Sequence, residues 1–514
     1  YQKSLQYNPK DRRILLSLSL MYETKGDRTR SEQFLLKALD AWAESPLVQA
    51  MAAEYYLRRQ DWAQALFHAQ TALALAPGYE KALQLLGTIH LRSGKFADAV
   101  AIMDQLIKIN PEDPVAWYQR GMAFLQQQKA PEALASFEKV LLFSPNDEVT
   151  RIILEDTVDQ YLSLEDPLRS RYAAYHFEQA NQFRKKNLYV RAEFHYRRGL
   201  RIAPLDANGR QQYADFLKAT DRKALFVQQL KILTDAGVKN NFVKDNLEIY
   251  SSLLASSVSN SWQVDQFVVE RDPLLLRQYY IMPRQISEHP LAEPYLARYV
   301  QTLLLTSPKL SMNQDRSENS ARILPRQVAN ESEAFASARG DRADYYVLVD
   351  LSESRDDFQG KVGLYLARTG NQLRSYAAYR SGNFRVQNAI WQICDSLQKE
   401  MPLRGRLLKR NLDEGLVNLG ADDGLKAKDV LNIVSPEAFI LKGDAPGFIY
   451  QQDKKTGSFT VTATDDLIAV GTVKREGFYD RINIGDIILR DGESLGKNLE
   501  PTANFPFLYN KIRS

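Results

Sequence analysis

Residues 117–145, WYQRGMAFLQQQKAPEALASFEKVLLFSP, decide the fold of the N-terminal part of the chain. Small side chains stand at Gly121 and Ala133, a large one stands at Phe124, and Pro145 closes the stretch. Small residues let two paired helices approach closely, and large residues fill the space beside them. Proline cannot continue a helix, so Pro145 marks the end of the second one. The stretch therefore predicts a pair of packed helices.

The same pattern recurs every 34 residues toward the N-terminus, in one register over residues 12–145. Its four kinds of position are a terminal proline, two small residues and one large residue. The terminal prolines are Pro9, Pro77, Pro111 and Pro145, and Ala43 stands at the one such position without proline. The first small residue is Ser19, Ala53, Gly87 or Gly121, and the second is Ser31, Ala65, Ala99 or Ala133. The large residue is Tyr22, Tyr56, His90 or Phe124. We expect four stacked helix pairs.

This register resembles the tetratricopeptide repeat (TPR) family. Its characteristic positions are occupied in the fourth unit by Trp117, Gly121, Phe124, Ala133, Phe137 and Pro145. The resemblance implies an α-solenoid that acts through protein–protein contacts. In the same register Tyr1 falls inside the second helix of an earlier, incomplete repeat. We therefore expect the chain to be cut from a longer protein, with upstream repeats and any targeting signal outside it.

Beyond Pro145 the phase breaks, and residues 146–172 add about one helix. The repeat pattern then resumes at Ala180, Phe183, Ala192, Tyr196, Gly199 and Pro204, and a weaker unit follows at Tyr213, Ala214 and Leu217. We assign residues 1–235 to the solenoid. Residues 236–324 are expected to be a helical bridge, with amphipathic stretches at 243–258 and 292–305, that ends in a polar linker.

The pattern changes after residue 340. Runs rich in Val, Tyr and Leu at 343–351, 361–367 and 374–380 predict strands, and Gly370-Asn371 predicts a hairpin turn between the last two. An amphipathic helix is expected at 386–401 and a short one at 333–339. Together these elements predict a small α/β layer over 325–402.

The last part of the chain is rich in short strands separated by Gly and Asp turns. The strand signals cover 404–410, 415–420, 429–434, 459–464, 467–476 and 485–492. They predict a small, SH3-like or barrel domain over 403–514. Its tail carries Phe505, Phe507 and Tyr509, which are expected to pack on the body or on a neighbour. The expected fold class is thus multidomain, with an α-solenoid, an α/β layer and a β-barrel.

Two further resemblances concern the C-terminal third. GDRADYYVLVD (340–350) and LYLARTGNQLRSYAAYRSGN (364–383) resemble the α/β domain of envelope proteins of the TolB-N type. The stretches at 405–434 and 469–490 resemble the C-terminal β domain of the flagellar H-ring protein T family, whose members join both units in this order. The resemblance covers about residues 325–495. It implies a periplasmic or cell-envelope setting, and a flagellar motor collar in its most specific form. This chain differs from that family by its long repeat array.

The sequence shows no catalytic or metal-binding constellation. The five histidines have no ligand-like spacing, and no phosphate-binding glycine loop is present. Asp422, Asp423 and Asp429 lack the spacing of a calcium loop. Cys394, the only cysteine, lies near the apolar face of its helix and is expected to pack there. We expect no metal, no cofactor and no enzyme activity.

The overall composition is that of an ordinary soluble protein, with 44% hydrophobic and 25% charged residues. A net charge of +4 on 514 residues gives no argument for nucleic acid. No apolar run reaches the roughly 18 residues that a transmembrane helix needs.

Two surfaces are candidates for binding a partner protein. The inner helix positions of the repeats hold Leu16, Leu20, Ala50, Glu54, Gln84, Thr88, Tyr118 and Met122. Lacking Lys, Arg and Asn, they suit a partner helix or loop better than a peptide carboxylate, and we select Glu54, Gln84, Tyr118 and Met122. The second candidate is the basic stretch 183–201. Its candidate residues are Arg184, Lys185, Lys186, Arg197, Arg198 and Arg201, although the favoured alternative is the solvated face of a helix pair.

These features favour a non-catalytic interaction scaffold of a bacterial envelope assembly, most specifically a periplasmic flagellar motor ring or collar component. Its partners would be other subunits, including copies of itself or motor and stator proteins. The alternative is an envelope lipoprotein or adaptor that recruits or regulates a cell-wall synthase or a secretion complex.

Overall fold

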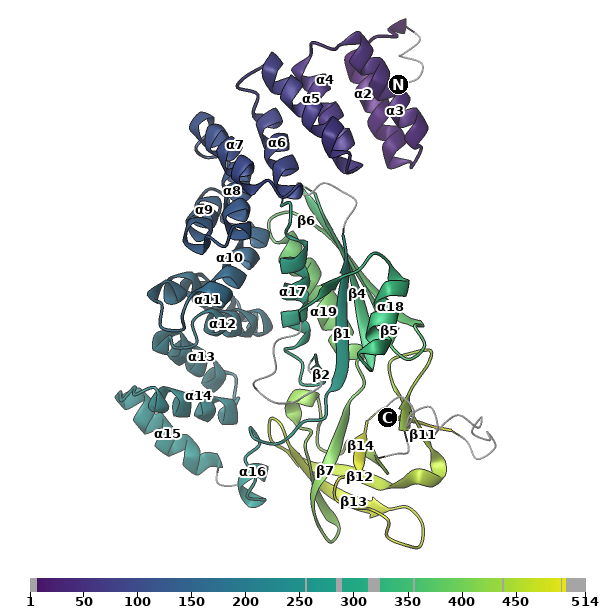
Figure 1. The fold of residues 1–514 in the computed structure, drawn as a ribbon. Helices are drawn as coiled ribbons and strands as arrows, with labels where there is room; N and C mark the ends of the chain where they lie inside the picture. The colour runs from purple at the N-terminus through teal and green to yellow at the C-terminus, as the bar shows by residue number, and fades with distance from the viewer. Residues whose placement is uncertain are drawn as a thin grey trace.

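The computed structural model describes residues 7–254, 257–282, 289–312, 324–354, 356–436, 439–490 and 492–495. A curved column of helices runs along one side of the molecule, and a sheet and a small barrel stand beside it (Figure 1). The beginning of the incomplete repeat at Tyr1, most of the polar linker and the tail at 505–509 lie outside the described residues.

The four repeats expected from the 34-residue register are confirmed as four antiparallel helix pairs. The pairs are α2 (Arg12–Thr24) with α3 (Arg28–Ala41), α4 (Pro46–Arg58) with α5 (Trp62–Leu75), α6 (Glu80–Arg92) with α7 (Phe96–Ile109), and α8 (Pro114–Gln126) with α9 (Ala130–Phe143). The same turn joins the two helices of every pair. It places Gly26, Gln60, Gly94 and Gln128 at positive φ, one repeat apart.

The break in phase corresponds to one additional helix, α10 (Glu148–Tyr161), as expected. Two more pairs follow, α11 (Pro167–Lys185) with α12 (Tyr189–Ile202) and α13 (Ala207–Ala219) with α14 (Lys223–Asp235). Helices α15 (Asn241–Leu253) and α16 (Val258–Ser261) end the helical part of about 250 residues. Asp147 caps α10, because its carboxylate accepts the backbone N–H of Thr150 at 3.0 Å.

The expectation of a helical bridge over 236–324 is wrong in part, because two strands, β1 and the short β2 (Leu310–Ser311), lie within it. Residues Leu274–Ile281 form strand β1, which pairs in parallel with β4 (Tyr345–Glu353). The run holds three leucines and two tyrosines, which suit a buried strand. Its partner comes much later in the chain, so no hairpin signal marks it. The expected helix at 292–305 is present as α17 (Glu293–Leu304).

The sheet has the order β2-β1-β4-β5-β6 and therefore begins well before residue 325. Its other members are β2 (Leu310–Ser311), β5 (Asp357–Leu366), β6 (Gln372–Ser381) and β3 (Arg326–Gln327), which pairs with β1. Successive residues of β4 face opposite sides. Tyr345 and Val347 pack in the core that contains α17 and α19 (Arg385–Glu400), whereas Tyr346 and Leu348 pack against α18 (Glu331–Gly340).

The C-terminal region contains the expected barrel, which is closed by six strands. Their order is β12 (Lys455–Thr464), β13 (Ala469–Arg475), β8 (Glu414–Val417), β7 (Arg404–Asn411), β14 (Ile487–Leu489) and β9 (Val430–Val434). Phe459, Leu431 and Ile433 are fully buried inside it. A small sheet of β10 (Phe439–Leu441), β11 (Phe448–Gln451) and β15 (Gly492–Leu495) lies beside the barrel.

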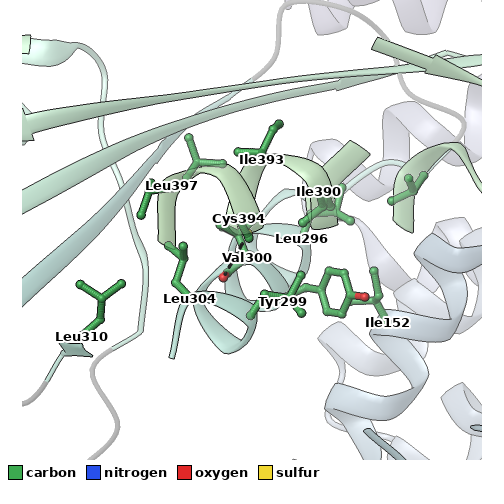
Figure 2. Close-up of a cluster of buried hydrophobic side chains, with 14 of the residues drawn as sticks. Ile152, Leu296, Tyr299, Val300, Leu304, Leu310, Ile390, Ile393, Cys394 and Leu397 are labelled. Carbon is green, nitrogen blue, oxygen red and sulfur yellow. Dashed lines mark hydrogen bonds between the residues drawn. The ribbon is translucent and has the colours of Figure 1, made fainter. Parts of the chain in front are cut away.

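The solenoid packs on the sheet through a layer of two helices. Figure 2 shows Ile152 of α10 beside Tyr299 and Leu296 of α17, with Ile390 of α19 next to them. These side chains belong to one hydrophobic cluster that extends from Leu91 to the sheet and to the small C-terminal strands. Helices α2–α5 stand beyond this layer at the end of the column (Figure 1), and their cores form separate clusters.

Candidate functional site

The inner face of the fourth repeat is covered by the chain itself. Tyr118 and Met122 are 1% and 0% exposed. The Tyr118 hydroxyl donates a hydrogen bond of 3.2 Å to the carbonyl oxygen of Pro290, and its ring meets His289 edge-on with centroids 4.6 Å apart. This corrects the expectation that Tyr118 and Met122 contact a partner, because the segment before α17 fills that place.

His289 joins the solenoid to the sheet. Its Nε2 lies 3.0 Å from Asp147 Oδ2, and its Nδ1 lies 2.7 Å from Glu353 Oε2. Both ring nitrogens face carboxylates, which only accept hydrogen bonds, so the imidazolium form satisfies them. Burial alone would lower the pKa of His289, but Asp147 and Glu353 raise it well above its ordinary value. Arg385, at the start of α19, also reaches Glu353, at 3.3 Å.

A second buried polar cluster lies between α10, α11 and α12. Arg198 donates from Nε to Glu155 at 2.7 Å and from Nη1 to Glu148. Burial would raise the pKa of Glu155, but Arg198 and His176 hold it below its ordinary value. Burial lowers the pKa of His176 to about 4, and the attraction of Glu155 offsets this only in part.

When the two histidines of this cluster are neutral, its hydrogen bonds fix which ring nitrogen of each histidine carries the proton. His176 donates from Nε2 to Glu155 at 2.7 Å, so its Nδ1 accepts from His195 Nδ1 at 3.0 Å. His195 Nε2 then accepts from Gln387 Nε2 of α19 at 3.3 Å. The chain of bonds couples the solenoid to α19.

The basic stretch 183–201 is not one continuous patch. Lys185 and Lys186 are exposed at the end of α11, and Arg184 is half-buried. Arg197 pairs with Glu193 at 2.7 Å, and Arg201 lies 3.5 Å from Glu155. The alternative interpretation expects Phe183, Tyr189, Phe194 and Tyr196 in the core. Tyr196 is buried and Phe183 and Phe194 are half-buried, but Tyr189 is 47% exposed, so the expectation is wrong for that residue.

Arg197, Arg198 and Arg201 of α12 line a cleft together with Arg222. The cleft has a volume of about 360 Å³ and lies where the solenoid, the α17–α19 layer and the barrel meet. Trp391, Cys394 and Leu303 form an apolar wall, and Asp422 of the barrel closes one side. We call this feature the junction cleft.

The inner face of the first two repeats remains open. Leu20, an inner position of α2, is 45% exposed, and Leu47, in the first turn of α4, is 40% exposed. Arg58 contacts Glu23 at 2.7 Å and Glu54 at 3.2 Å, and Lys81 lies 3.7 Å from Glu54. All these contacts stay within the solenoid, as does the hydrogen bond of 2.9 Å from Gln84 to Asp113. Glu54 is thus itself an inner position of α4, and Gln84 is an inner position of α6 in the third repeat. We call the inner positions of α2 and α4 the open face.

The other candidate groups have structural partners. In the described part of the chain, no group of three or more His, Cys, Asp or Glu side chains is arranged to hold a metal ion. Asp422 pairs with Arg222, and Asp423 pairs with Arg271. Cys394 is 3% exposed in the layer shown in Figure 2, where burial raises the pKa of its thiol. Among the described helices, none has the length and apolar character needed to cross a membrane.

Several functional residues were not recognised in the sequence. Glu148, Glu155, His289, Glu353 and Arg385 all lie in buried polar contacts between distant segments. A signal existed for Glu148 and Glu155, which are seven residues apart on the face of α10 that also carries buried Ile152. No comparable signal marks His289 or Glu353.

Comparison with known proteins agrees with the repeat register. Models of the tetratricopeptide repeat match residues 56–123 and 114–147. The chain contains tetratricopeptide repeats. Another family model, described as a second domain (TPASS_0648_2nd), matches residues 276–399. This range begins in β1 and ends in α19, so it coincides with the sheet and the helices that cover it.

The individual relatives match only part of this chain. The chain is 36% identical over 66 residues to the tetratricopeptide repeat domain-containing protein PYG7, chloroplastic, of Arabidopsis thaliana. The match covers 13% of this chain and 22% of that protein. Among solved structures, MamA is 23% identical over 29% of this chain and 86% of its own, with a TM-score of 0.26. YrrB, described as a TPR protein with an unusual peptide-binding site, is 17% identical over 40% of this chain and 92% of its own, with a TM-score of 0.28.

Proposed function

We propose that this protein is a non-catalytic scaffold that holds a partner protein on the open face of its first two repeats. The observation that supports this most directly is the division of the solenoid. From Leu91 onward much of its core belongs to the cluster of the sheet layer, whereas the cores of α2–α5 remain local, as does a small cluster around Met103. Of the inner positions of α2 and α4, Leu20 and Glu54 therefore keep accessible surface, whereas Leu16 and Ala50 are buried in these local cores.

The chemistry of the open face suits a helix or loop of a partner protein. Leu20 and Leu47 supply apolar contact area. Glu23, Arg58, Glu54 and Lys81 surround them with charges that already neutralise one another. Such a surface, apolar with compensated charges, favours an amphipathic segment over a strongly charged peptide.

The cellular setting is part of the proposal. We place the protein in a bacterial envelope assembly in the periplasm, as a flagellar motor ring or collar component. The support is the sequence resemblance over residues 325–495 alone. The adaptor of a cell-wall synthase or secretion complex is the second candidate, since the stretches at 340–350 and 364–383 also resemble envelope lipoproteins.

Crosslinking in cells followed by mass spectrometry tests both parts. The full-length protein would be tagged, and the double variant Leu20→Asp/Leu47→Asp would be compared with Leu36→Asp. Leu36 is 50% exposed on α3 and is not an inner position, so it provides a control of similar exposure. Loss of a specific partner only in the double variant supports the open face, and equal capture by all three proteins contradicts it. Motor or ring proteins as partners support the collar, whereas cell-wall synthases or secretion proteins favour the adaptor.

A further inference from the structure

We propose that one end of the barrel inserts into the headgroup region of an anionic lipid bilayer. The contact surface consists of the hairpin between β7 and β8 and the loop between β13 and β14. Its apolar members are Leu412 on the hairpin and Phe478, Tyr479 and Ile484 on the loop, and we call these four residues the loop-tip patch. Strands β7 and β13 lie at the lower end of the molecule in Figure 1. This surface is separate from the open face, so its test is independent of the proposed scaffold function.

The first argument is the exposure of these four side chains. Leu412 and Phe478 are 85% and 84% exposed, and Tyr479 and Ile484 are 76% and 65% exposed. They are gathered on two neighbouring loops and not scattered singly over the surface. Exposed apolar side chains that are gathered in this way mark contacts with a membrane or with another protein.

The second argument is that both loops have a defined conformation. Arg410 joins them, because its guanidinium donates to Asp480 of the loop at 2.7 Å and to the carbonyl oxygen of Leu412 at 2.9 Å. Ile482, in the middle of the loop, is 6% exposed and packs in the barrel core. The loop therefore buries one isoleucine and presents another, Ile484, to solvent. Because the apolar tips are already held in place, little conformational entropy is lost when they bind.

The third argument is the positive charge beside the apolar tips. Lys474 and Arg475 precede the loop and Arg481 lies within it, and all three are exposed. Within the described part of the chain, none of the three forms an ion pair with a carboxylate. The guanidinium of Arg481 donates only to the carbonyl oxygens of Asp453 and Lys455, at 3.1 and 3.4 Å. The three cations are therefore free to contact anionic lipid headgroups.

The acidic residues beside the tips limit this charge only in part. Asp480 pairs with Arg410 at 2.7 Å, and Glu476 pairs with Lys455 at 3.0 Å. The hairpin 411–414 contains two further acidic residues, which are exposed. We therefore expect the apolar side chains to supply most of the binding free energy and the cations to supply the preference for anionic lipid.

The form of the surface favours lipid over a protein partner. Phe478 and Tyr479 meet edge to face with centroids 5.1 Å apart, and both are largely exposed, so they form a convex tip. A convex tip needs a matching pocket on a protein, whereas a fluid headgroup region accommodates it without one. Aromatic and aliphatic side chains beside Lys and Arg are also the usual composition of segments that bind at a membrane interface.

Flotation of the full chain with lipid vesicles tests this inference. Vesicles of phosphatidylcholine and phosphatidylglycerol in equal parts are compared with vesicles of phosphatidylcholine alone. We expect the protein to float with the anionic vesicles and to bind the neutral ones about tenfold more weakly. Absence of binding to both kinds of vesicle would overturn the proposal, and equal binding to both would overturn the assigned class of lipid.

A double variant locates the contact without touching the barrel core. Leu412→Ser/Phe478→Ser removes one apolar tip from each loop and should weaken vesicle binding at least about tenfold. The matched control is Leu142→Ser/Phe67→Ser, because Leu142 and Phe67 are 64% and 59% exposed on α9 and α5. Both variants should keep the urea midpoint of the parent, since all four side chains are exposed. Equal vesicle binding by the two double variants would overturn the proposal.

Charge reversal tests the cations separately. Lys474→Glu/Arg475→Glu should abolish the preference for anionic vesicles, whereas Lys185→Glu/Lys186→Glu, at the exposed end of α11, should leave it unchanged. Loss of the preference only in the α11 variant would place the lipid contact on the basic stretch 183–201 and overturn the loop-tip patch. If the parent binds no vesicles but Leu412→Ser/Phe478→Ser loses a crosslinked protein, the tips form a protein interface and the lipid proposal is wrong.

Discussion

The hydroxyl of Tyr118 and the carbonyl oxygen of Pro290 are joined by a hydrogen bond of 3.2 Å, although 172 residues separate them in the chain. Tyr118 belongs to the fourth repeat, and Pro290 precedes the helix that covers the sheet. The bond thus lies in the part of the solenoid that packs against the sheet layer. Beyond it, the repeats and the sheet share one core.

Loss of this bond should destabilise the shared body. Tyr118→Phe leaves the Pro290 carbonyl without its partner in a buried place, so the free energy of unfolding should fall by about 1 kcal/mol. Urea denaturation followed by circular dichroism measures the change. Tyr479→Phe is the control, because Tyr479 is 76% exposed, and its effect should be close to zero. A Tyr118→Phe transition that coincides with that of the parent protein would contradict this account.

The two glycines of the repeat register should respond differently to alanine. A Cβ at Gly121 would lie 2.6 Å from the ring of Phe137, which cannot move away without disturbing the core. Gly121→Ala should therefore cost about 1–3 kcal/mol. At Gly87 the close atoms are the flexible ends of Met103 and Gln119, so they can shift.

Gly87→Ala should thus be neutral or stabilising by up to about 1 kcal/mol, because alanine favours helix over glycine. Thermal unfolding of both variants gives the comparison. The double variant Gly121→Ala/Phe137→Leu should recover part of the loss, since it removes the ring that the new methyl group meets. Equal destabilisation by both glycine changes would show that the close approach to Phe137 is not what matters.

The repeats could be predicted from the sequence because their constraints are local and recur. Gly121 and Gly87 stand at one position of the register, and the turns at Gly26, Gln60, Gly94 and Gln128 recur with it. Each repeat contacts mainly its neighbours, so a period of 34 residues carries most of the information. The barrel strands were predictable for a similar reason, since each pairs with another nearby in sequence or ends at a Gly turn.

The parts that could not be predicted depend on contacts between distant segments. Strand β1 is stabilised by β4, and nothing next to Leu274–Ile281 reveals that partner. His289 has an ordinary sequence context, yet its two carboxylates come from Asp147, the N-cap of α10, and from Glu353 at the end of β4. The inner position of Tyr118 predicted a contact with a partner protein. The repeat pattern shows that such a position is available for contact, but it does not show whether another molecule or a later segment of the same chain fills it.

His289 should give the protein a characteristic dependence on pH. Its pKa in the folded protein is raised well above 6.5, so its stabilisation is fully present below pH 6.5 and is lost as the pH rises through the folded-state value. Every pKa unit of that rise corresponds to about 1.4 kcal/mol. The difference in unfolding free energy between the parent and His289→Gln should therefore be largest between pH 5 and about 6.5 and should shrink at alkaline pH.

His68 provides a control of the opposite sign. Burial lowers its pKa, and its Nδ1 contacts only the amide oxygen of Gln49, at 2.7 Å. The parent should lose stability relative to His68→Gln as the pH falls below about 6.5, because protonation then favours the unfolded chain. Urea midpoints at pH 5, 7 and 9 for both variants decide the matter. Parallel profiles for the two histidines would refute the ionic role of His289.

The ion pair of Arg198 with Glu155 should be strongly coupled. Their side chains are 4% and 2% exposed and 2.7 Å apart, so removal of one leaves the other charged and buried. Glu155→Met and Arg198→Met should each cost about 3–5 kcal/mol. The double variant should cost less than the sum by about 2 kcal/mol, because both charges of the pair are then gone and Glu148 keeps Arg151 as a partner at 3.7 Å. The exposed pair Arg30 and Asp27, at 3.5 Å, provides the reference cycle and should show coupling below about 0.5 kcal/mol. Equal coupling energies in the two cycles would mean that Arg198 and Glu155 are solvated in the folded protein. That result would contradict the buried polar cluster that links the solenoid to α19.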